Sequence, residues 1–385
     1  MRQGLWLVFL LGGLLAGGPA AAGDTPGPLV LVRNHLDLAR GSESIQLQAS
    51  ALKPWFKADE LPRLRVTETA GGRELLAQAV DSDGDGAFDQ LVFQAALGPR
   101  EQKSFLLTLG ERQVPGKEDF RAYGRFVRER FDDFAWENDR VAFRMYGRAL
   151  ETWEKEPLTS SAVDVWCKRT RRLVVNDWYL VDDYHRDTGE GADLYSAGSS
   201  RGCGGSGIWS GGRLFGSRNF RDSRVLANGP IRLVFELVYE PWDAGGRKVS
   251  EVKRVTLDAG ENLNRFESRY LMEGGPELDW AAGIKKQPRS NVRFEREQGW
   301  LRTWEPLKEG AGSLGCGIVV APAQVPETAE ADGNVLVVAR APAVYHAGFG
   351  WDRSGDFAGV ADWDRYLETF ARRLRSPLEV EVKAR

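Results

Sequence analysis

The stretch Ile231-Arg-Leu-Val-Phe-Glu-Leu-Val-Tyr-Glu240 decides the fold class, because apolar and charged side chains alternate along it. One face carries Ile231, Leu233, Phe235, Leu237 and Tyr239, and the other carries Arg232, Glu236 and Glu240. Successive side chains of an extended strand point to opposite faces, so a period of two predicts a half-buried β-strand.

Two segments downstream repeat this alternation. They are Lys253–Asp258 and Leu263–Leu271, joined by the turn Asp258–Asn262. In the second segment Arg265, Glu267 and Arg269 share one face. Three such strands predict a large antiparallel sheet with one polar face, which is either a solvated back or a surface that handles a polar ligand.

The rest of the chain predicts further strands and one helix. Strand candidates before residue 115 are Leu29–Val32, Ile45–Ala49, Leu64–Thr69, Leu75–Val80, Gln90–Ala95 and Ser104–Leu109. Their spacing is typical of a β-sandwich. Later candidates are Gly317–Ala321, Val335–Ala339 and a closing strand over 378–382, after a helix on which Trp363, Tyr366, Leu367, Phe370 and Leu374 recur, with Asp362 as its cap. We divide the chain into a strand-rich part over 23–115 and a main part over 116–385, within one continuous domain over 23–385.

Composition narrows the function classes. The 385 residues carry 52 Lys+Arg against 55 Asp+Glu, a net charge of −3, which gives no support for nucleic-acid binding through bulk charge. Residues 1–22 read as a secretory signal, with Arg2, an apolar run over 5–15 and a small-residue cleavage site at Ala20–Ala22. We therefore expect an exported, periplasmic or extracellular protein with no membrane span after cleavage. The sequence does not determine its oligomeric state.

The three cysteines, Cys167, Cys203 and Cys316, allow one disulfide at most, and we expect three small buried side chains.

Asp81, Asp83, Asp85 and Asp89 fall in the run Asp81-Ser-Asp-Gly-Asp-Gly-Ala-Phe-Asp89. Oxygen ligands at alternate positions suit Ca²⁺, but Val92 replaces the bidentate glutamate of a helix–loop–helix site. The alternatives are a calcium-stiffened turn between strands and a plain Asp/Gly turn.

Two stretches concentrate groups that carry chemistry. Arg121–Tyr146 mixes a tryptophan with carboxylates and arginines, which suits a sugar ring and its hydroxyls or uronate, or else a salt-bridged strand edge. The second runs from Trp166 through Tyr184, His185 and Asp193 into the glycine-rich segment 189–212, which predicts a long functional loop. His185 is the most suggestive residue there, as acid, base or structural hydrogen-bonding group.

An ordered set of motifs resembles a bacterial family, the domain of unknown function 4861. The motifs are Arg125–Arg130, Trp136–Arg140, Asp164–Lys168, Asp182–His185, Arg201–Trp209, Asn228–Arg232 and Leu257–Glu267. That family in turn resembles the galactose mutarotase-like group, whose members handle sugars on a large antiparallel sheet. The resemblance implies a mainly β chain, a large antiparallel β-supersandwich with long loops and a short C-terminal helix.

Three classes of function remain open. The first is a carbohydrate-active enzyme, either a uronate lyase, a glycoside hydrolase or an epimerase that pairs His185 with Glu267. The others are a noncatalytic glycan-binding protein and a structural envelope protein. The candidate catalytic residues are His185, Tyr184, Glu137, Asp139 and Glu267. The candidate substrate-binding residues, for an oligo- or polysaccharide, are Trp136, Arg140, Arg144, Tyr146, Trp166, Lys168, Asp182, Asp193, Trp209 and Arg265.

Overall fold

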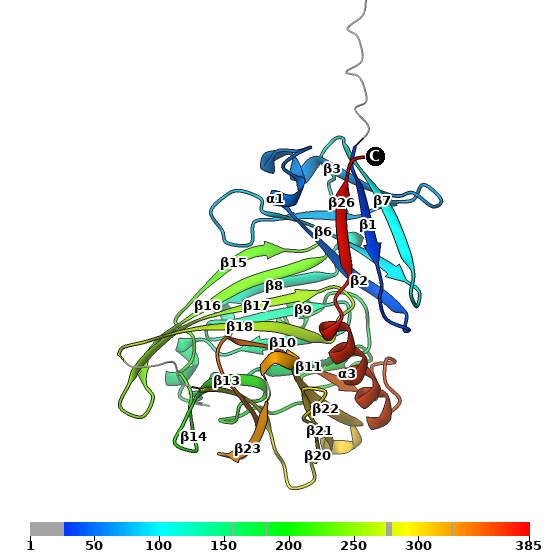
Figure 1. The fold of residues 1–385 in the computed structure, drawn as a ribbon. Helices are drawn as coiled ribbons and strands as arrows, with labels where there is room; N and C mark the ends of the chain where they lie inside the picture. The colour runs from blue at the N-terminus through cyan, green and yellow to red at the C-terminus, as the bar shows by residue number, and fades with distance from the viewer. Residues whose placement is uncertain (1–26, 156, 182, 275–278, 325) are drawn as a thin grey trace, which may run out of the picture.

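The computed structural model describes residues 27–155, 157–181, 183–274, 279–324 and 326–385 (Figure 1). The predicted signal over 1–22 and the candidate Asp182 lie outside these ranges. Within them the chain is mainly β, and the strands pair antiparallel throughout its sheets. The prediction of a mainly β chain with a large antiparallel sheet and a C-terminal helix is confirmed.

Two sheets, of five and three strands, form the N-terminal part. One has the order β26 (Glu379–Lys383), β1 (Leu29–Arg33), β7 (Gln102–Leu109), β3 (Leu64–Glu68) and β4 (Glu74–Leu75). The other has the order β2 (Arg40–Gln48), β6 (Gln90–Leu97) and β5 (Ala77–Val80), followed along the chain from β2 by α1 (Ala49–Leu52). Their apolar faces enclose a core that includes Val30, Phe93 and Phe105. The last strand of the chain lies beside the first (Figure 1), so this part receives its edge strand from the opposite terminus.

Three sheets, of eight, five and five strands, form the main part. The eight-stranded sheet runs β15 (Asp222–Asn228), β16 (Arg232–Asp243), β17 (Lys248–Asp258), β18 (Leu263–Met272), β25 (Ala343–Trp351), β22 (Ser313–Val320), β21 (Trp300–Pro306) and β20 (Asn291–Glu295). One five-stranded sheet runs β12 (Gly191–Ala192), β11 (Asp164–Lys168), β10 (Ala142–Met145), β9 (Asp133–Asn138) and β8 (Ala122–Val127). The other runs β14 (Arg213–Phe215), β13 (Cys203–Ser210), β19 (Asp279–Lys285), β24 (Asn334–Ala339) and β23 (Glu327–Ala331).

The main core joins these three sheets. Leu233, Phe235, Leu237 and Tyr239 of β16 lie in it as the alternation predicted, with Trp136 of β9 and Trp280 of β19 among the residues that they join. Short 3₁₀ turns lie at Ala58–Arg63, Lys117–Asp119, Arg128–Arg130, Arg148–Thr152, Lys308–Gly310 and Pro322–Gln324.

The C-terminal helix α3 (Val360–Arg375) packs Trp363 and Leu367 on the outer face of β22. A Cβ on Gly317 of β22 would lie 2.8 Å from Leu367, so glycine permits this close approach. The predicted cap was wrong. Gly359 precedes the helix, and Asp362 lies in its first turn, where a carboxylate oxygen accepts the Ala358 N–H at 2.9 Å.

The glycine-rich segment 189–212 is not one long loop, so that prediction was wrong. It contains β12 and the buried eight-residue strand β13, which pairs with β19. Here glycine serves close backbone packing, because a Cβ on Gly207 would lie 2.6 Å from the Phe215 carbonyl oxygen. A high glycine content therefore indicates either a flexible loop or, as in β13, a strand that packs closely against neighbouring backbone.

The three cysteines are buried and free, as the sequence predicted. Across the described ranges, no helix is both long enough and apolar enough to cross a bilayer.

Candidate functional site

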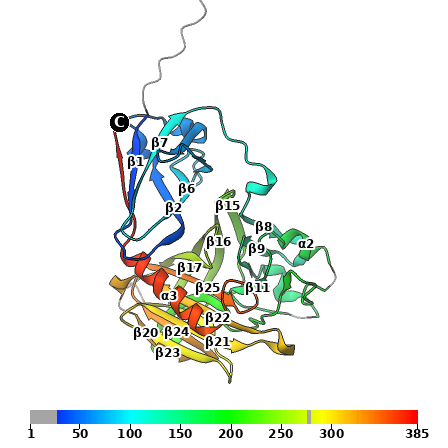
Figure 2. The same cartoon turned by 90° about the vertical axis from the view of Figure 1, so that its right-hand side faces the viewer.

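Polar groups gather on the outer face of the sheet that contains β9, β10 and β11. Phe143 and Met145 of β10 point into the main core, so the alternation places Arg144 on the opposite face. In the same way Val165 and Cys167 of β11 face the core and leave Asp164 and Trp166 outside. The helix α2 (Val175–Tyr179) covers this face, and Figure 2 shows it beside β9 and β11, away from α3.

Arg144 is the centre of what we name the arginine-144 cluster, which comprises Arg144, Asp133, Asp164, Asp193, Tyr146 and Tyr184. Its Nε donates to Asp164 Oδ2 at 2.8 Å and its Nη2 donates to Asp193 Oδ2 at 2.9 Å. Its Nη1 donates to the Tyr184 hydroxyl at 3.1 Å and lies 3.8 Å from Asp133 Oδ2. Tyr146 donates its hydroxyl proton to Asp164 Oδ2 at 3.0 Å. All six side chains are buried.

The cluster holds more acid than its central cation can neutralise. Burial raises the pKa of Asp133 to about 7, against the opposing effect of Arg144 and Arg130. Burial also raises the pKa of Asp193 well above its ordinary value, although Arg144 opposes this. Within the described part of the chain, Oδ1 of Asp133 and Oδ1 of Asp193 have no hydrogen-bond partner. Protonation of these two carboxyls lowers the net negative charge that the cluster buries.

Solvent lies beside one edge of the cluster, at Arg130 and His185, which are half-buried and exposed and both contact the buried Tyr184. The Arg130 Nε donates to the Tyr184 hydroxyl at 2.7 Å, so that oxygen accepts from two guanidinium groups. The Arg130 guanidinium also lies over the rings of Trp153, Phe131 and Tyr184, at 5.0, 5.6 and 5.7 Å. Trp153 stacks on Phe131 with ring centroids 4.4 Å apart. Half-buried rings beside guanidinium groups form a surface that suits a sugar.

His185 lies at this edge with 58% of its side chain exposed. Its Nδ1 is 3.1 Å from the backbone carbonyl oxygen of Asp193 and 3.5 Å from the Asp193 carboxylate. A carbonyl oxygen only accepts, so the Nδ1 carries the hydrogen and the Nε2 of the neutral ring holds the free lone pair. The ring centroid lies 4.6 Å from that of Tyr184.

The backbone that leads into β9 adopts an unusual conformation beside this edge. Phe131 and Asp132 both have positive φ angles, 53° and 65°, immediately before Asp133. Left-handed backbone is uncommon for a bulky residue and costs of order 1–3 kcal/mol per residue. The surrounding contacts therefore hold Asp133 and the Phe131 ring in fixed positions.

Several predicted site residues belong to the structural frame. Glu137 is buried, and its carboxylate accepts from Lys168 Nζ at 2.7 Å and from the backbone N–H groups of Val174 and Val175. Burial lowers the pKa of Lys168, although Glu137 opposes this. Trp136 lies in the main core and donates to Asn264 Oδ1 at 2.7 Å. Trp166 is buried under Tyr184, with ring centroids 5.2 Å apart.

Other predicted residues lie away from the cluster. Asp139 accepts the Gly260 N–H at 2.7 Å, and Arg140 lies 3.6 Å from the Asp356 carboxylate. Arg265 and Glu267 form an ion pair at 2.6 Å on the outer face of β18. Trp209 of β13 packs against a small apolar cluster on β19 and β24. The main core separates Glu267 from His185, so the structure does not bring that predicted acid–base pair together.

Sequence reasoning missed four members of the site, namely Arg130, Asp133, Trp153 and Asp164. Arg130 and Asp164 stand in stretches that the motifs already marked, so their position carried a signal. Asp133 lies outside the named motifs and directly follows two positive-φ residues. Trp153 reaches the site from the 3₁₀ turn Arg148–Thr152, which the sequence did not connect to His185.

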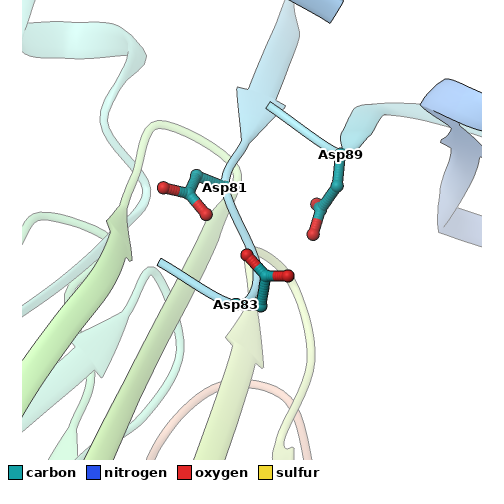
Figure 3. Close-up of side chains that lie close together, drawn as sticks. All are labelled: Asp81, Asp83 and Asp89. Atoms are coloured by element: carbon teal, nitrogen blue, oxygen red, sulfur yellow. The ribbon is translucent and has the colours of Figure 1, made fainter. Parts of the chain in front are cut away.

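The acidic run in the N-terminal part brings three of its four carboxylates together (Figure 3). Carboxylate oxygens of Asp81, Asp83 and Asp89 all lie within 4.8 Å of one another. Burial opposes the ionisation of Asp81, yet N–H donations from Gly86 and Gly84 outweigh it and lower the pKa of that carboxyl. Asp85 is not in this group, and its Oδ1 accepts the Ala87 N–H at 2.8 Å.

Comparison with known proteins identifies the family. The model for a family described as a domain of unknown function, number 4861, matches residues 32–380. The "Uncharacterized protein P7" of Formosa agariphila is 33% identical over 402 aligned residues, which cover 100% of both chains.

Two solved structures from Enterococcus faecalis are similar at 11% identity with a TM-score of 0.48. One is described as an alpha-mannosidase, with 93% of this chain and 46% of that chain covered. The other is a protein in the glycosyl hydrolase family 38, with 94% and 48% covered. This chain therefore spans about half the length of either, and an identity this low transfers no residue and no reaction.

Proposed function

For this chain, which belongs to the family named domain of unknown function 4861, we propose an exported carbohydrate-active enzyme that transfers protons at the Tyr184–His185 edge of the arginine-144 cluster. One observation carries the proposal. The Tyr184 hydroxyl is held by two guanidinium groups beside a solvent-exposed imidazole whose tautomer is set by a carbonyl oxygen. An acid and a base next to each other, with cations to stabilise negative charge, are the parts that proton-transfer catalysis needs.

The reaction that this arrangement supports best is β-elimination from a uronate-containing glycan. His185 Nε2 takes the proton from C5, and its bonding electrons form the C4=C5 double bond. The C4–O bond breaks as the Tyr184 hydroxyl protonates the leaving oxygen. Arg130 is half-buried at the edge and suits the uronate carboxylate, while Arg144 stabilises the negative charge left on the Tyr184 oxygen. Water then returns a proton from the imidazolium to Tyr184.

A glycoside hydrolase is the second candidate, and the burial of the carboxylates counts against it. Hydrolysis uses two carboxyl groups on either side of the scissile bond. Asp133, Asp164, Asp193 and Glu137 are buried and engaged with Arg144 or Lys168. A noncatalytic binding platform would use the same aromatic edge, but it gives no role to a fixed His185 tautomer.

The test uses the purified protein with a panel of uronate-containing and neutral polysaccharides. Ultraviolet absorbance of the unsaturated uronate and reducing ends are measured together. We expect both signals to rise on a uronate substrate. Reducing ends without the absorbance would support hydrolysis, and measurable binding with neither signal would overturn the enzyme proposal in favour of a binding protein.

Replacing Trp153 tests the aromatic edge. Trp153→Ala removes the ring that stacks on Phe131 and lies under Arg130, so we expect KM or Kd for the glycan to rise about tenfold, or about 1.4 kcal/mol. The matched control is Trp209→Ala, a half-buried tryptophan on a different sheet, which should change affinity less than about twofold. Equal losses in the two variants would contradict a sugar surface at Trp153.

We further propose that Ca²⁺ binds the turn over 81–89 through Asp81, Asp83 and Asp89. A ligand that binds only the folded state at 100 times its Kd stabilises it by about 2.7 kcal/mol. Ca²⁺ should therefore raise the melting temperature above that in chelator, and Asp83→Asn should remove most of the increase. Asp85→Asn is the control, because Asp85 lies outside the three-carboxylate group. An equal calcium response in Asp83→Asn would overturn this site.

A further inference from the structure

A cavity lies where the N-terminal part, the eight-stranded sheet and α3 meet, and we name it the junction pocket. Its volume is about 380 Å³, within the range of ligand pockets. Residues of β2, of β16 to β18, of β25 and of the chain from the end of α3 into β26 line it. The main core separates it from the arginine-144 cluster, which lies on the outer face of a different sheet.

The walls of the junction pocket differ in chemistry. One wall is apolar and comes mainly from the end of α3 and the strands beside it, with Phe370, Leu374, Leu378, Val380 and Ile45. The other wall is the polar face of the large sheet, with Arg232, Thr256 and Arg265, and it meets the apolar wall where His346 packs against Phe370. A sugar ring presents apolar C–H groups on one side and hydroxyls around its edge, so it matches such a pair of walls.

The fixed charges around the pocket cancel. Arg232 pairs with Asp258 at 2.7 Å, and Arg373 pairs with Glu261 at 2.5 Å and with Glu43 at 2.9 Å. Glu43 also pairs with the buried Arg40 at 3.2 Å. An anionic ligand would therefore meet no unpaired positive charge among these arginines. The cost of removing its charge from water would exceed the electrostatic attraction that it gains.

Several hydrogen-bonding groups on the polar wall stay uncommitted. Arg265 uses one nitrogen for Glu267, and its remaining N–H groups face no partner in the described ranges. The Nδ1 of His346 is buried and likewise has no partner there. The two residues are cross-strand neighbours on β18 and β25, but the His346 ring packs against Phe370 with ring centroids 5.0 Å apart. The side chain of Arg265 is 42% exposed, so Arg265 is the one of the two that offers N–H groups to a ligand. Burial lowers the pKa of His346 to about 3, which leaves a neutral ring with one donor and one acceptor.

We propose that the junction pocket binds a neutral saccharide of one or two rings, with its hydroxyls on Arg265 and its C–H face toward the apolar wall. This goes beyond the proposed reaction, because it is a second, noncatalytic sugar site in a separate place. Since the ligand would contact the N-terminal part, the large sheet and α3 together, its binding should stabilise their junction.

The test combines calorimetry and melting temperature with galactose, xylose, cellobiose and glucuronate as probes. We expect at least one neutral sugar to bind and raise the melting temperature. Arg265→Met should weaken that binding at least tenfold. Arg269→Met, on the same face of β18 but outside the pocket, should change it less than twofold.

Three results would overturn the proposal. They are no binding by any neutral probe, binding of glucuronate alone, and unchanged binding in Arg265→Met. The measurement is repeated in His185→Ala, where binding at the junction pocket should persist. Loss of binding in that variant would place the sugar at the arginine-144 cluster instead, so the two sites are distinguished whichever of them fails.

Discussion

Tyr184→Phe is expected to lower kcat about 10²- to 10⁴-fold on the glycan that the polysaccharide panel identifies, the range that positioned acid–base groups contribute. The substitution removes one hydroxyl and keeps the ring that packs on Trp166. The loss arises because the leaving oxygen no longer receives a proton from Tyr184 and the two guanidinium groups no longer have a phenolic oxygen to stabilise. His185→Ala should fall in the same range, because it removes the base.

Tyr179→Phe is the matched control. Tyr179 belongs to the same aromatic group, with its ring centroid 5.8 Å from that of Tyr184, but its buried hydroxyl has no partner in the described ranges. Its removal should leave kcat within about twofold and the fold intact, since an unpaired buried hydroxyl contributes nothing favourable. Wild-type kcat in Tyr184→Phe, or an equal loss in Tyr179→Phe, would contradict the proposed role. Urea unfolding of both variants separates a catalytic loss from a structural one.

The alternation in Ile231–Glu240 was enough to predict the sheet, because period-two burial is a local property of the chain. The glycine-rich segment misled for the opposite reason. Gly207 must be a glycine because a Cβ would clash with the Phe215 carbonyl oxygen. That contact forms only when the sheet folds, so the local sequence does not reveal it.

The site was predictable only in part. His185, Tyr184, Arg144 and Asp193 stood out by residue type, and the structure brings them together. Glu137 and Lys168 were equally plausible site residues in the sequence, yet they form a buried ion pair at 2.7 Å. The Glu137 carboxylate accepts the Val175 N–H at the start of α2. The local sequence does not distinguish a buried ion pair from a solvent-accessible site. The difference depends on which face of the sheet is covered by other elements such as α2.

The stability that the arginine-144 cluster contributes should fall as the pH rises from about 4 to above 7, and Asp133→Asn should remove a large share of this dependence. The folded-state pKa of Asp133 is about 7, well above the ordinary value of 3.8. A group with a raised pKa binds its proton more tightly when folded, so its contribution is fully present below the unfolded pKa and is lost as the pH rises through the folded pKa. A difference of about three units corresponds to about 4 kcal/mol.

Urea unfolding between pH 4 and pH 8 measures this dependence, with the variant gaining on the wild type by about 4 kcal/mol across the range. Asp193 has a raised pKa for the same reason, so the wild-type dependence should exceed the share of Asp133 alone, and a residual slope should remain in Asp133→Asn. Asp59→Asn, at an exposed position, is the control and should follow the wild type within about 0.5 kcal/mol. Parallel pH profiles for Asp133→Asn and the wild type would show that Asp133 is ionised at no cost in the folded protein. Arg144 and Arg130 together would then compensate the charge of Asp133 in full, and burial would not raise its pKa.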